Sequence, residues 1–125
     1  MTLNYKEFGQ GEPLIILHGL FGTLDNWQTL AKRFAENNLV FIIDQRNHGK
    51  SPHLPEHSYA LMAEDLREFM ESQHMYKAHI LGHSMGGKTA MKFALTYPDM
   101  VDKLTIVDIS PRAVSYTHLT LPTKA

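Results

Sequence analysis

The sequence predicts an α/β fold in which a mainly parallel sheet is covered by helices on both faces. Four short, continuous apolar runs, each typical of a buried strand, alternate along the chain with amphipathic segments at helical spacing. The connections between them are short, which is typical of strand–helix–strand units with parallel strands. The chain has 125 residues, of which 43% are hydrophobic, so it can form the core of one domain at most.

The individual elements follow from the same patterns. Buried strands are expected at residues 13–17, 39–44, 78–82 and 103–109, and residues 3–8, which alternate in polarity, are expected to form an antiparallel edge strand. One helix is expected to begin with Asp25 as its N-cap, since Gln28 follows three residues later, and a second to begin at Ser58. A third is expected over residues 88–97, because Pro98 would end it.

Each of the first two helices has one apolar face. The apolar side chains at helical spacing are Trp27, Leu30, Ala31, Phe34 and Ala35 in the first helix and Tyr59, Met62, Ala63, Leu66, Phe69 and Met70 in the second. We expect both faces to be buried against the sheet, with Trp27 in the core rather than stacked on a substrate.

The residues of chemical interest follow the predicted strands. HGLFG (18–22) follows the first buried strand, DQRNHGKS (44–51) the second and GHSMG (82–86) the third, while Asp108 stands at the end of the fourth. Because ligands bind at the carboxyl ends of parallel strands, we expect these segments to form one site. Asp44 and Arg46 are expected to hold their loop through a local ion pair.

The serine of the third segment is the candidate nucleophile. Ser84 has glycines two positions to either side and lies between a predicted strand and a predicted helix, which is typical of a nucleophile elbow. The glycines would relieve the collisions of so tight a turn. The backbone N–H of Met85 would then face an oxyanion, and Leu20, or less favourably Phe21, would supply a second N–H. The alternative is a glycine-rich turn that only joins a strand to a helix.

Four segments together carry a resemblance to a known family. HGLFGTLDNW, IIDQRNHGKSP, GHSMGGKTAM and KLTIVDISP, in this order and at these spacings, resemble the amino-terminal half of an α/β-hydrolase, in particular YbfF-type esterases and related abhydrolase-domain proteins. The resemblance covers about residues 3–112. It implies a serine esterase or thioesterase that cleaves short acyl esters through an acyl-enzyme, without a cofactor. It does not fix the substrate, since such folds also host lactonases, peroxidases and carbon–carbon hydrolases.

A serine nucleophile also needs an imidazole base and a carboxylate that orients it. In this fold the chain order is serine, acid, histidine. Asp108 ends a strand at the catalytic edge, and the YbfF-type esterases are similar in having an aspartate there, so Asp108 is the candidate acid. Two alternatives stay open: an acid one strand later, as in many family members, and an aspartate that only caps the turn before Pro111.

The chain has eight histidines, but the one that could serve as the base is in doubt. They are His18, His48, His53, His57, His74, His79, His83 and His118, and a structural role is expected for the first seven. No pair of them has a spacing typical of a metal site. His118 alone follows Ser84, and it lies in a segment that does not continue the pattern of the fold.

The last residues resemble something other than a protein family. Residues 114–123, VSYTHLTLPT, match the in-frame translation of a transposase adapter used in sequencing libraries. We therefore interpret residues 1–112 as a partial α/β-hydrolase domain, truncated before its lid and base histidine, and residues 113–125 as a non-native tail. On this interpretation His118 is no base, the 125-residue chain alone is a poor hydrolase or none, and its last strand is an unpaired apolar edge.

Composition excludes other classes of function. The balance of 12 basic and 13 acidic residues indicates no nucleic-acid partner and no anionic membrane surface, and no apolar run is long enough to cross a membrane. There is no cysteine and no signal-peptide pattern, so a cytoplasmic protein acting on a small acyl ester or thioester is expected, with unknown oligomeric state. The alternatives are a lactonase or lyase on the same fold and a non-catalytic binding protein. GHSMGGK lacks the spacing of a nucleotide-binding loop.

Overall fold

The computed structural model describes residues 1–20 and 22–107, and the backbone of residues 120–122. Its strands are β1 (Tyr5–Phe8), β2 (Glu12–Leu17), β3 (Asn38–Ile43), β4 (Ala78–His83), β5 (Val101–Val107) and β6 (Thr120–Pro122). Its helices are α1 (Gln28–Phe34), α2 (Tyr59–Ser72) and α3 (Met85–Thr96), with short 3-10 helices η1 (Leu24–Trp27) and η2 (Pro98–Met100). Within this part of the chain no helix combines the length and the apolar composition needed to cross a membrane.

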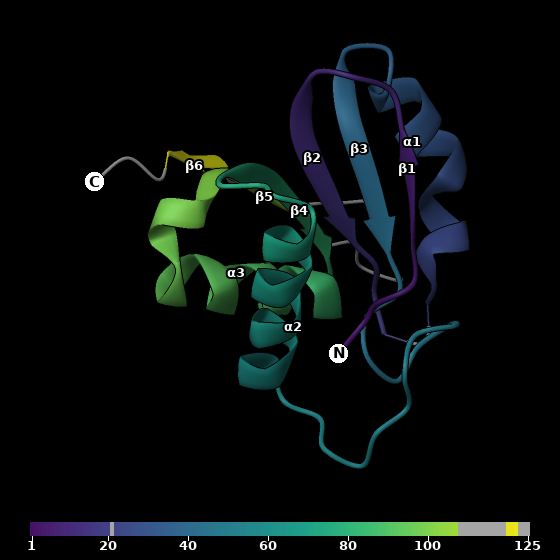
Figure 1. Ribbon diagram of the computed structural model, residues 1–125, viewed down its shortest axis with the longest axis vertical. Coiled ribbons are helices and arrows are strands. Elements are labelled where there is room, and N and C mark those ends of the chain that lie inside the picture. The colour runs from purple at the N-terminus through teal and green to yellow at the C-terminus, as the bar shows by residue number, and fades with distance from the viewer. Residues whose placement is uncertain (21, 108–119, 123–125) are drawn as a thin grey trace.

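The strands form one sheet with the order β1-β3-β2-β4-β5-β6 (Figure 1). The central pairs β2–β3, β2–β4 and β4–β5 are parallel, so the predicted fold class is confirmed. β1 lies antiparallel to β3 at one edge, also as expected. The expectation that the last strand would have an unpaired edge is wrong, because β6 pairs antiparallel with β5 and Leu104 lies opposite Leu121.

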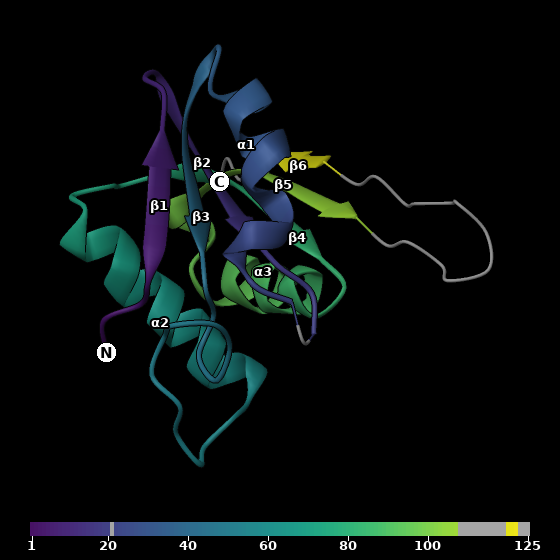
Figure 2. The ribbon, with the colours of Figure 1, turned by 90° about the vertical axis from the view of Figure 1, so that its right-hand side faces the viewer.

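Helices cover both faces of the sheet, because the buried strands are apolar on both sides. α2 and α3 pack on one face, where Ile15, Leu17 and Ile80 point into the larger apolar cluster. α1 packs on the other face against Leu14 and Ile16, which point the opposite way along the same strand. Figure 2 shows α1 in front of β2 and β3, with α2 and α3 behind the sheet.

The helix beginnings agree only in part with the prediction. Ser58 caps α2 as expected, with its side chain accepting a hydrogen bond from the Leu61 N–H at 3.1 Å. The prediction of Asp25 as an N-cap is wrong, because Thr23 and Asn26 form a capping box two residues earlier. The physical reason is that the chain first makes the 3-10 turn η1, which needs its own cap and contains Asp25.

Candidate active site

The carboxyl ends of β2, β3 and β4 bring the predicted segments to one edge of the sheet. Leu17, the last residue of β2, lies beside Ile43 of β3 on one side and beside Gly82 of β4 on the other. The segments 18–22, 44–51 and 84–86 therefore start from neighbouring positions, as the sequence predicts. Asp108, the candidate acid, lies outside the described residues.

Ser84 has a backbone conformation that few residues other than glycine adopt. Its φ is 54° and its ψ is −115°, and it stands directly between β4 and α3. Such a conformation costs about 1–3 kcal/mol and persists only where the surrounding structure holds it. Here the Ser84 N–H donates to the Val107 carbonyl at 3.2 Å, and the Lys88 N–H donates to the Ser84 carbonyl at 3.1 Å in the first turn of α3. The side chain is thus presented at an exposed position above the sheet.

The glycines on either side of Ser84 allow backbones to approach more closely than any side chain would permit. A Cβ on Gly82 would lie 2.3 Å from the Gly86 carbonyl oxygen. A Cβ on Gly86 would lie 2.2 Å from the Leu17 carbonyl oxygen, at the end of β2. The elbow is therefore packed backbone to backbone against β2, which is why the pattern requires glycine at both positions.

The loop after β2 lies against this elbow. A Cβ on Gly19 would lie 3.4 Å from the Ser84 Cβ and 2.9 Å from the His83 Nδ1. Leu20 is 56% exposed and lines, together with Ser84 and Met85, a cavity of about 530 Å³. The two preferred oxyanion donors are thus residues that border the same cavity as the serine. Phe21, the less favoured donor, lies outside the described residues.

His18 ties the beginning of this loop to Gln45, in the loop after β3. Its Nε2 accepts the Gln45 N–H at 3.0 Å, so its proton lies on Nδ1, which donates to the Gly19 carbonyl at 2.8 Å. The Gln45 side-chain amide in turn donates to the His18 carbonyl at 2.8 Å. Burial of the ring, which is 1% exposed, lowers the pKa of His18, because the charged form would lose its hydration.

We expect the free energy of unfolding to fall as the pH falls below about 6.5, the ordinary imidazole value. In that range the unfolded chain protonates His18 while the buried ring resists protonation, so the unfolded state binds more protons and gains stability relative to the native state. Urea denaturation at about pH 7.5 and about pH 5.5, in the unaltered chain and in His18→Asn, measures this. The other histidines act equally in both proteins, so an identical pH dependence in the two would contradict the expectation.

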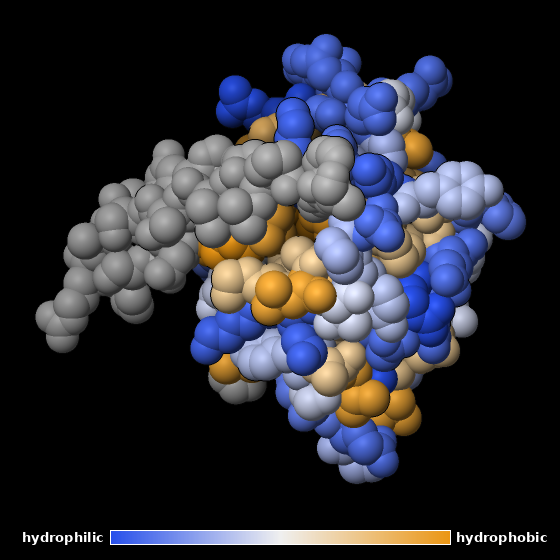
Figure 3. All heavy atoms as spheres, turned by 90° about the vertical axis from the view of Figure 1, so that its left-hand side faces the viewer, coloured by the Kyte–Doolittle hydropathy of each residue, from blue (hydrophilic) through white to orange (hydrophobic). Residues whose placement is uncertain are grey.

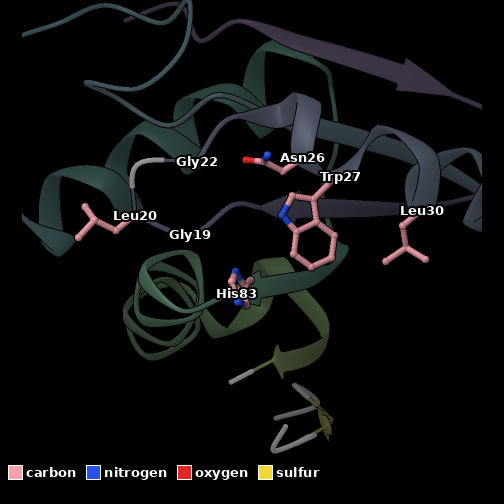
Figure 4. Close-up of a pocket in the computed structure, with 7 residues that line it drawn as sticks. All are labelled: Gly19, Leu20, Gly22, Asn26, Trp27, Leu30 and His83. Atoms are coloured by element: carbon pink, nitrogen blue, oxygen red, sulfur yellow. The ribbon is translucent and has the colours of Figure 1, made fainter. Parts of the chain in front are cut away.

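Trp27 differs from the expectation of a core residue. It is half-buried and packs against the smaller apolar cluster, but one side of its indole faces a cavity of about 340 Å³. Its ring centroid lies 5.7 Å from that of His83, at an interplanar angle of 58°. Figure 4 shows both rings directed into this cavity, with Leu20 and Leu30 toward its two ends. Leu30 is 36% exposed, so this position of the predicted buried face is open to the cavity.

Asp44 and Arg46 both hold the loop after β3, but not through each other, so the predicted ion pair is wrong. The buried Asp44 carboxylate accepts hydrogen bonds from the Leu24 N–H at 2.7 Å and the Lys50 N–H at 3.0 Å. It also accepts one from the Asn4 side chain at 2.9 Å. These donors satisfy the carboxylate and tie it to the loop after β2.

Arg46 reaches across to α2 instead. Its Nε and Nη2 donate to the two carboxylate oxygens of Asp65 at 2.7 and 2.9 Å, and both side chains are buried. This hydrogen bonding raises the pKa of Arg46. Sequence reasoning missed Asp65 because it lies on the apolar face of a helix, where a carboxylate has no local signal, and its partner is 19 residues away.

Among the described histidines, His57 is the one that lines the 530 Å³ cavity together with Ser84. The sequence predicted a structural role for it, because it lies in a proline-containing loop and forms no pair at metal-binding spacing. His118, which follows Ser84, lies outside the described residues. The described residues contain no group of three His, Cys, Asp or Glu side chains that could hold a metal ion.

Comparisons with known proteins agree with this architecture. The family model described as the alpha/beta hydrolase fold matches residues 12–124. Curated relatives include an sn-1-specific diacylglycerol lipase of Danio rerio, 44% identical over 92% of this chain and 38% of that protein. The Escherichia coli esterase YbfF is 42% identical over 79% of this chain and 39% of that protein.

Solved structures give the same result. A marine microorganism esterase is 54% identical with a TM-score of 0.84, covering 87% of this chain and 42% of that one. An N-acyl homoserine lactone degrading enzyme is 29% identical with a TM-score of 0.81, covering 84% of this chain and 41% of that one. The chain thus spans about two fifths of the length of these relatives. With its parallel sheet, its elbow and these matches, the chain belongs to the α/β-hydrolase fold family, among relatives that include esterases and lipases.

Proposed function

We propose that this chain is part of a serine hydrolase of the carboxylesterase or thioesterase type, which cleaves short acyl esters through an acyl-enzyme. The observation that carries the proposal is the backbone of Ser84, held at a φ of 54° between a strand and a helix. Its two flanking glycines sit where no Cβ fits. So strained a serine at the edge where ligands bind in such sheets is better explained by catalysis than by a simple connection.

In the proposed mechanism the Ser84 Oγ attacks the carbonyl carbon of the ester while its proton passes to an imidazole. The backbone N–H groups of Met85 and Leu20 stabilise the negative oxygen of the tetrahedral intermediate. This intermediate collapses, the C–O or C–S bond breaks, and the alcohol or thiol leaves with the proton from the imidazole. Water then hydrolyses the acyl-enzyme by the same steps and restores the serine.

The base and the acid of this mechanism lie outside the described residues. We assign the role of acid to Asp108, and the role of base to a later histidine of the longer protein of which we propose this chain is part, in the order of this fold. On our interpretation of residues 113–125 as a non-native tail, that histidine is not His118. A small-molecule acyl ester or thioester is then the partner, and no step requires a metal or an organic cofactor.

Fluorophosphonate labelling, read by peptide mass spectrometry, tests the proposal. The reagent is applied to the 125-residue chain and to the product of the reading frame at its source locus, where that frame is longer. We expect the longer product to be labelled at Ser84, because the reagent needs an activated serine. Ser58 serves as the control, since its hydroxyl lines the same cavity but caps α2.

Other outcomes favour other interpretations. Labelling of the 125-residue chain that is lost in His118→Ala would make His118 the base and the tail native. A locus product that contains a later histidine but resists labelling would favour a hydrolase-like binding protein. A labelled enzyme that opens acyl homoserine lactones faster than linear esters would favour a lactonase, the activity named for one structural relative.

A further inference from the structure

The loop between β3 and α2 is organised around one residue with an unusual backbone. Asn47 has a φ of 66°, in a region that asparagine tolerates better than other non-glycine residues. Its N–H donates to the Pro52 carbonyl at 2.9 Å, and its side-chain Oδ1 accepts the Leu54 N–H at 2.6 Å. Its Nδ2 lies 3.0 Å from the Nδ1 of His57. Asn47 therefore bonds to the loop at three successive points.

These bonds fix which nitrogen of His57 carries the proton. The backbone N–H of Leu54 can only donate, so the atom of Asn47 that it contacts is the oxygen. The amide nitrogen of Asn47 then faces His57, and since it too can only donate, the Nδ1 of His57 is the acceptor. Neutral His57 consequently has its proton on Nε2, so this nitrogen is a hydrogen-bond donor and not a base.

The loop that carries His57 is held on both sides of this residue. The Nη1 of Arg46 donates to the Glu56 carbonyl at 3.1 Å, while the rest of the guanidinium is fixed on the buried Asp65. On the other side, Ser58 caps α2. His57 is exposed to solvent, but its neighbours in the chain are tied to α2, and its ring contacts Asn47 and lines the cavity.

The cavity that His57 and Ser84 share is suited to oxygen acceptors. Its polar wall includes the His57 imidazole and the Lys88 ammonium, and no carboxylate is among the described residues that line it. On the other side of Ser84, Met91, Ile106 and Val107 line a second cavity of about 340 Å³ that suits an acyl chain. Figure 3 shows apolar surface on the side of the molecule where α3 and β5 lie.

We propose that His57 is a substrate-binding residue whose Nε2–H donates a hydrogen bond to an oxygen acceptor on the alcohol part of the ester. The site would thus prefer esters whose alcohol carries a second acceptor, such as another ester carbonyl, over esters of simple alkyl alcohols. This inference rests on the proposed function in one respect, namely that an ester occupies the cavity beside Ser84. It assigns His57 no part in the chemical step.

Binding to a Ser84→Ala form of the 125-residue chain tests this without requiring catalysis. Ethylene glycol diacetate carries a second ester carbonyl and ethyl acetate does not, and NMR titration gives the dissociation constant of each. We expect the diacetate to bind about fivefold more tightly, which corresponds to one hydrogen bond between neutral groups. In His57→Phe this preference should disappear. In His57→Gln, whose amide can donate from nearly the same place, it should be retained.

Asn47→Asp gives the sharpest test, because it adds a negative charge that moves the proton of His57 to Nδ1 while the His57 ring and the shape of side chain 47 are retained. At about pH 9, where imidazole is neutral, an aspartate would accept both the Leu54 N–H and a proton on His57 Nδ1, so that Nε2 becomes an acceptor. The preference for the diacetate should then be lost although the ring remains. His53→Phe, which alters another exposed histidine of the same loop, is the matched control and should retain it.

The outcomes separate this inference from the proposed function. If no preference exists, or if it survives in His57→Phe and Asn47→Asp, the inference is overturned, whether or not Ser84 is labelled by fluorophosphonate. If the preference depends on His57 as described but Ser84 resists labelling, the binding role stands and the hydrolase proposal fails. Loss of the preference in His53→Phe as well would mean that the loop as a whole, and not the Nε2 donor of His57, causes the preference. That result would also overturn the inference.

Discussion

Replacing Ser84 with alanine should lower kcat for the hydrolysis of para-nitrophenyl butyrate by about a millionfold, the loss typical of removing a serine nucleophile. The reason is that the Oγ forms the bond of the acyl-enzyme, and the remaining donors of Met85 and Leu20 can only stabilise a transition state that water must reach unaided. Steady-state rates, measured without the reagent on the length of protein that fluorophosphonate labels, give the comparison. The Michaelis constant should change little, because the cavity walls remain.

Two further variants make this result specific. Ser58→Ala removes a hydroxyl from the same cavity and should leave kcat within about tenfold, since Ser58 is engaged as the cap of α2. Ser84→Gly should abolish activity as alanine does, but raise the free energy of unfolding by about 1 kcal/mol, because glycine relieves the strain at a φ of 54°. An alanine variant that kept a tenth of the activity would show that the nucleophile is another group.

Replacing Gly86 with alanine should lower the free energy of unfolding by about 3 kcal/mol or more. The added Cβ would lie 2.2 Å from the carbonyl oxygen of Leu17 and 2.6 Å from that of His18. Both atoms belong to the backbone at the end of β2, which is buried between β3 and β4 and cannot move without breaking the sheet. Urea denaturation followed by circular dichroism measures the loss.

The neighbouring glycine provides the matched control. A Cβ on Gly87 would lie 3.2 Å from the Cγ2 of Ile106, a partly exposed side chain that can turn away, and 3.3 Å from the Gly82 carbonyl oxygen. Both contacts are about 1 Å longer than the contact of a Gly86 Cβ with the Leu17 carbonyl oxygen, so a shift of a few tenths of an ångström relieves them. Gly87→Ala should therefore cost much less than Gly86→Ala, and the higher helix propensity of alanine, about 1 kcal/mol, would offset part of that cost. Equal losses in the two variants would mean that glycine is needed throughout this turn for chain flexibility rather than for the approach of α3 to β2.

The sequence predicts an element most accurately where the local pattern of apolar residues matches the residues that are buried in the fold. Each buried strand was predicted within about two residues of its position, because an apolar run of that length between turns has few alternatives in a covered sheet. The beginning of α2 at Ser58 was predicted for a similar reason, since the cap and the bond that it makes lie within one turn. The start of α1 was misplaced, because the chain first makes the 3-10 turn η1, which Thr23 and Asn26 cap.

The sequence by itself determined the fold class, the order of the elements and the residue at the elbow. Spacing along the chain is sufficient for these, because strands, helices and the Gly-x-Ser-x-Gly turn are specified by neighbours a few residues apart. Only the tertiary structure decided that Arg46 pairs with Asp65, that Asp44 binds Leu24, and that His57 borders the cavity of Ser84. These partners are separated by 19 to 27 residues and meet only when the sheet and α2 have packed, so no local pattern could have identified them.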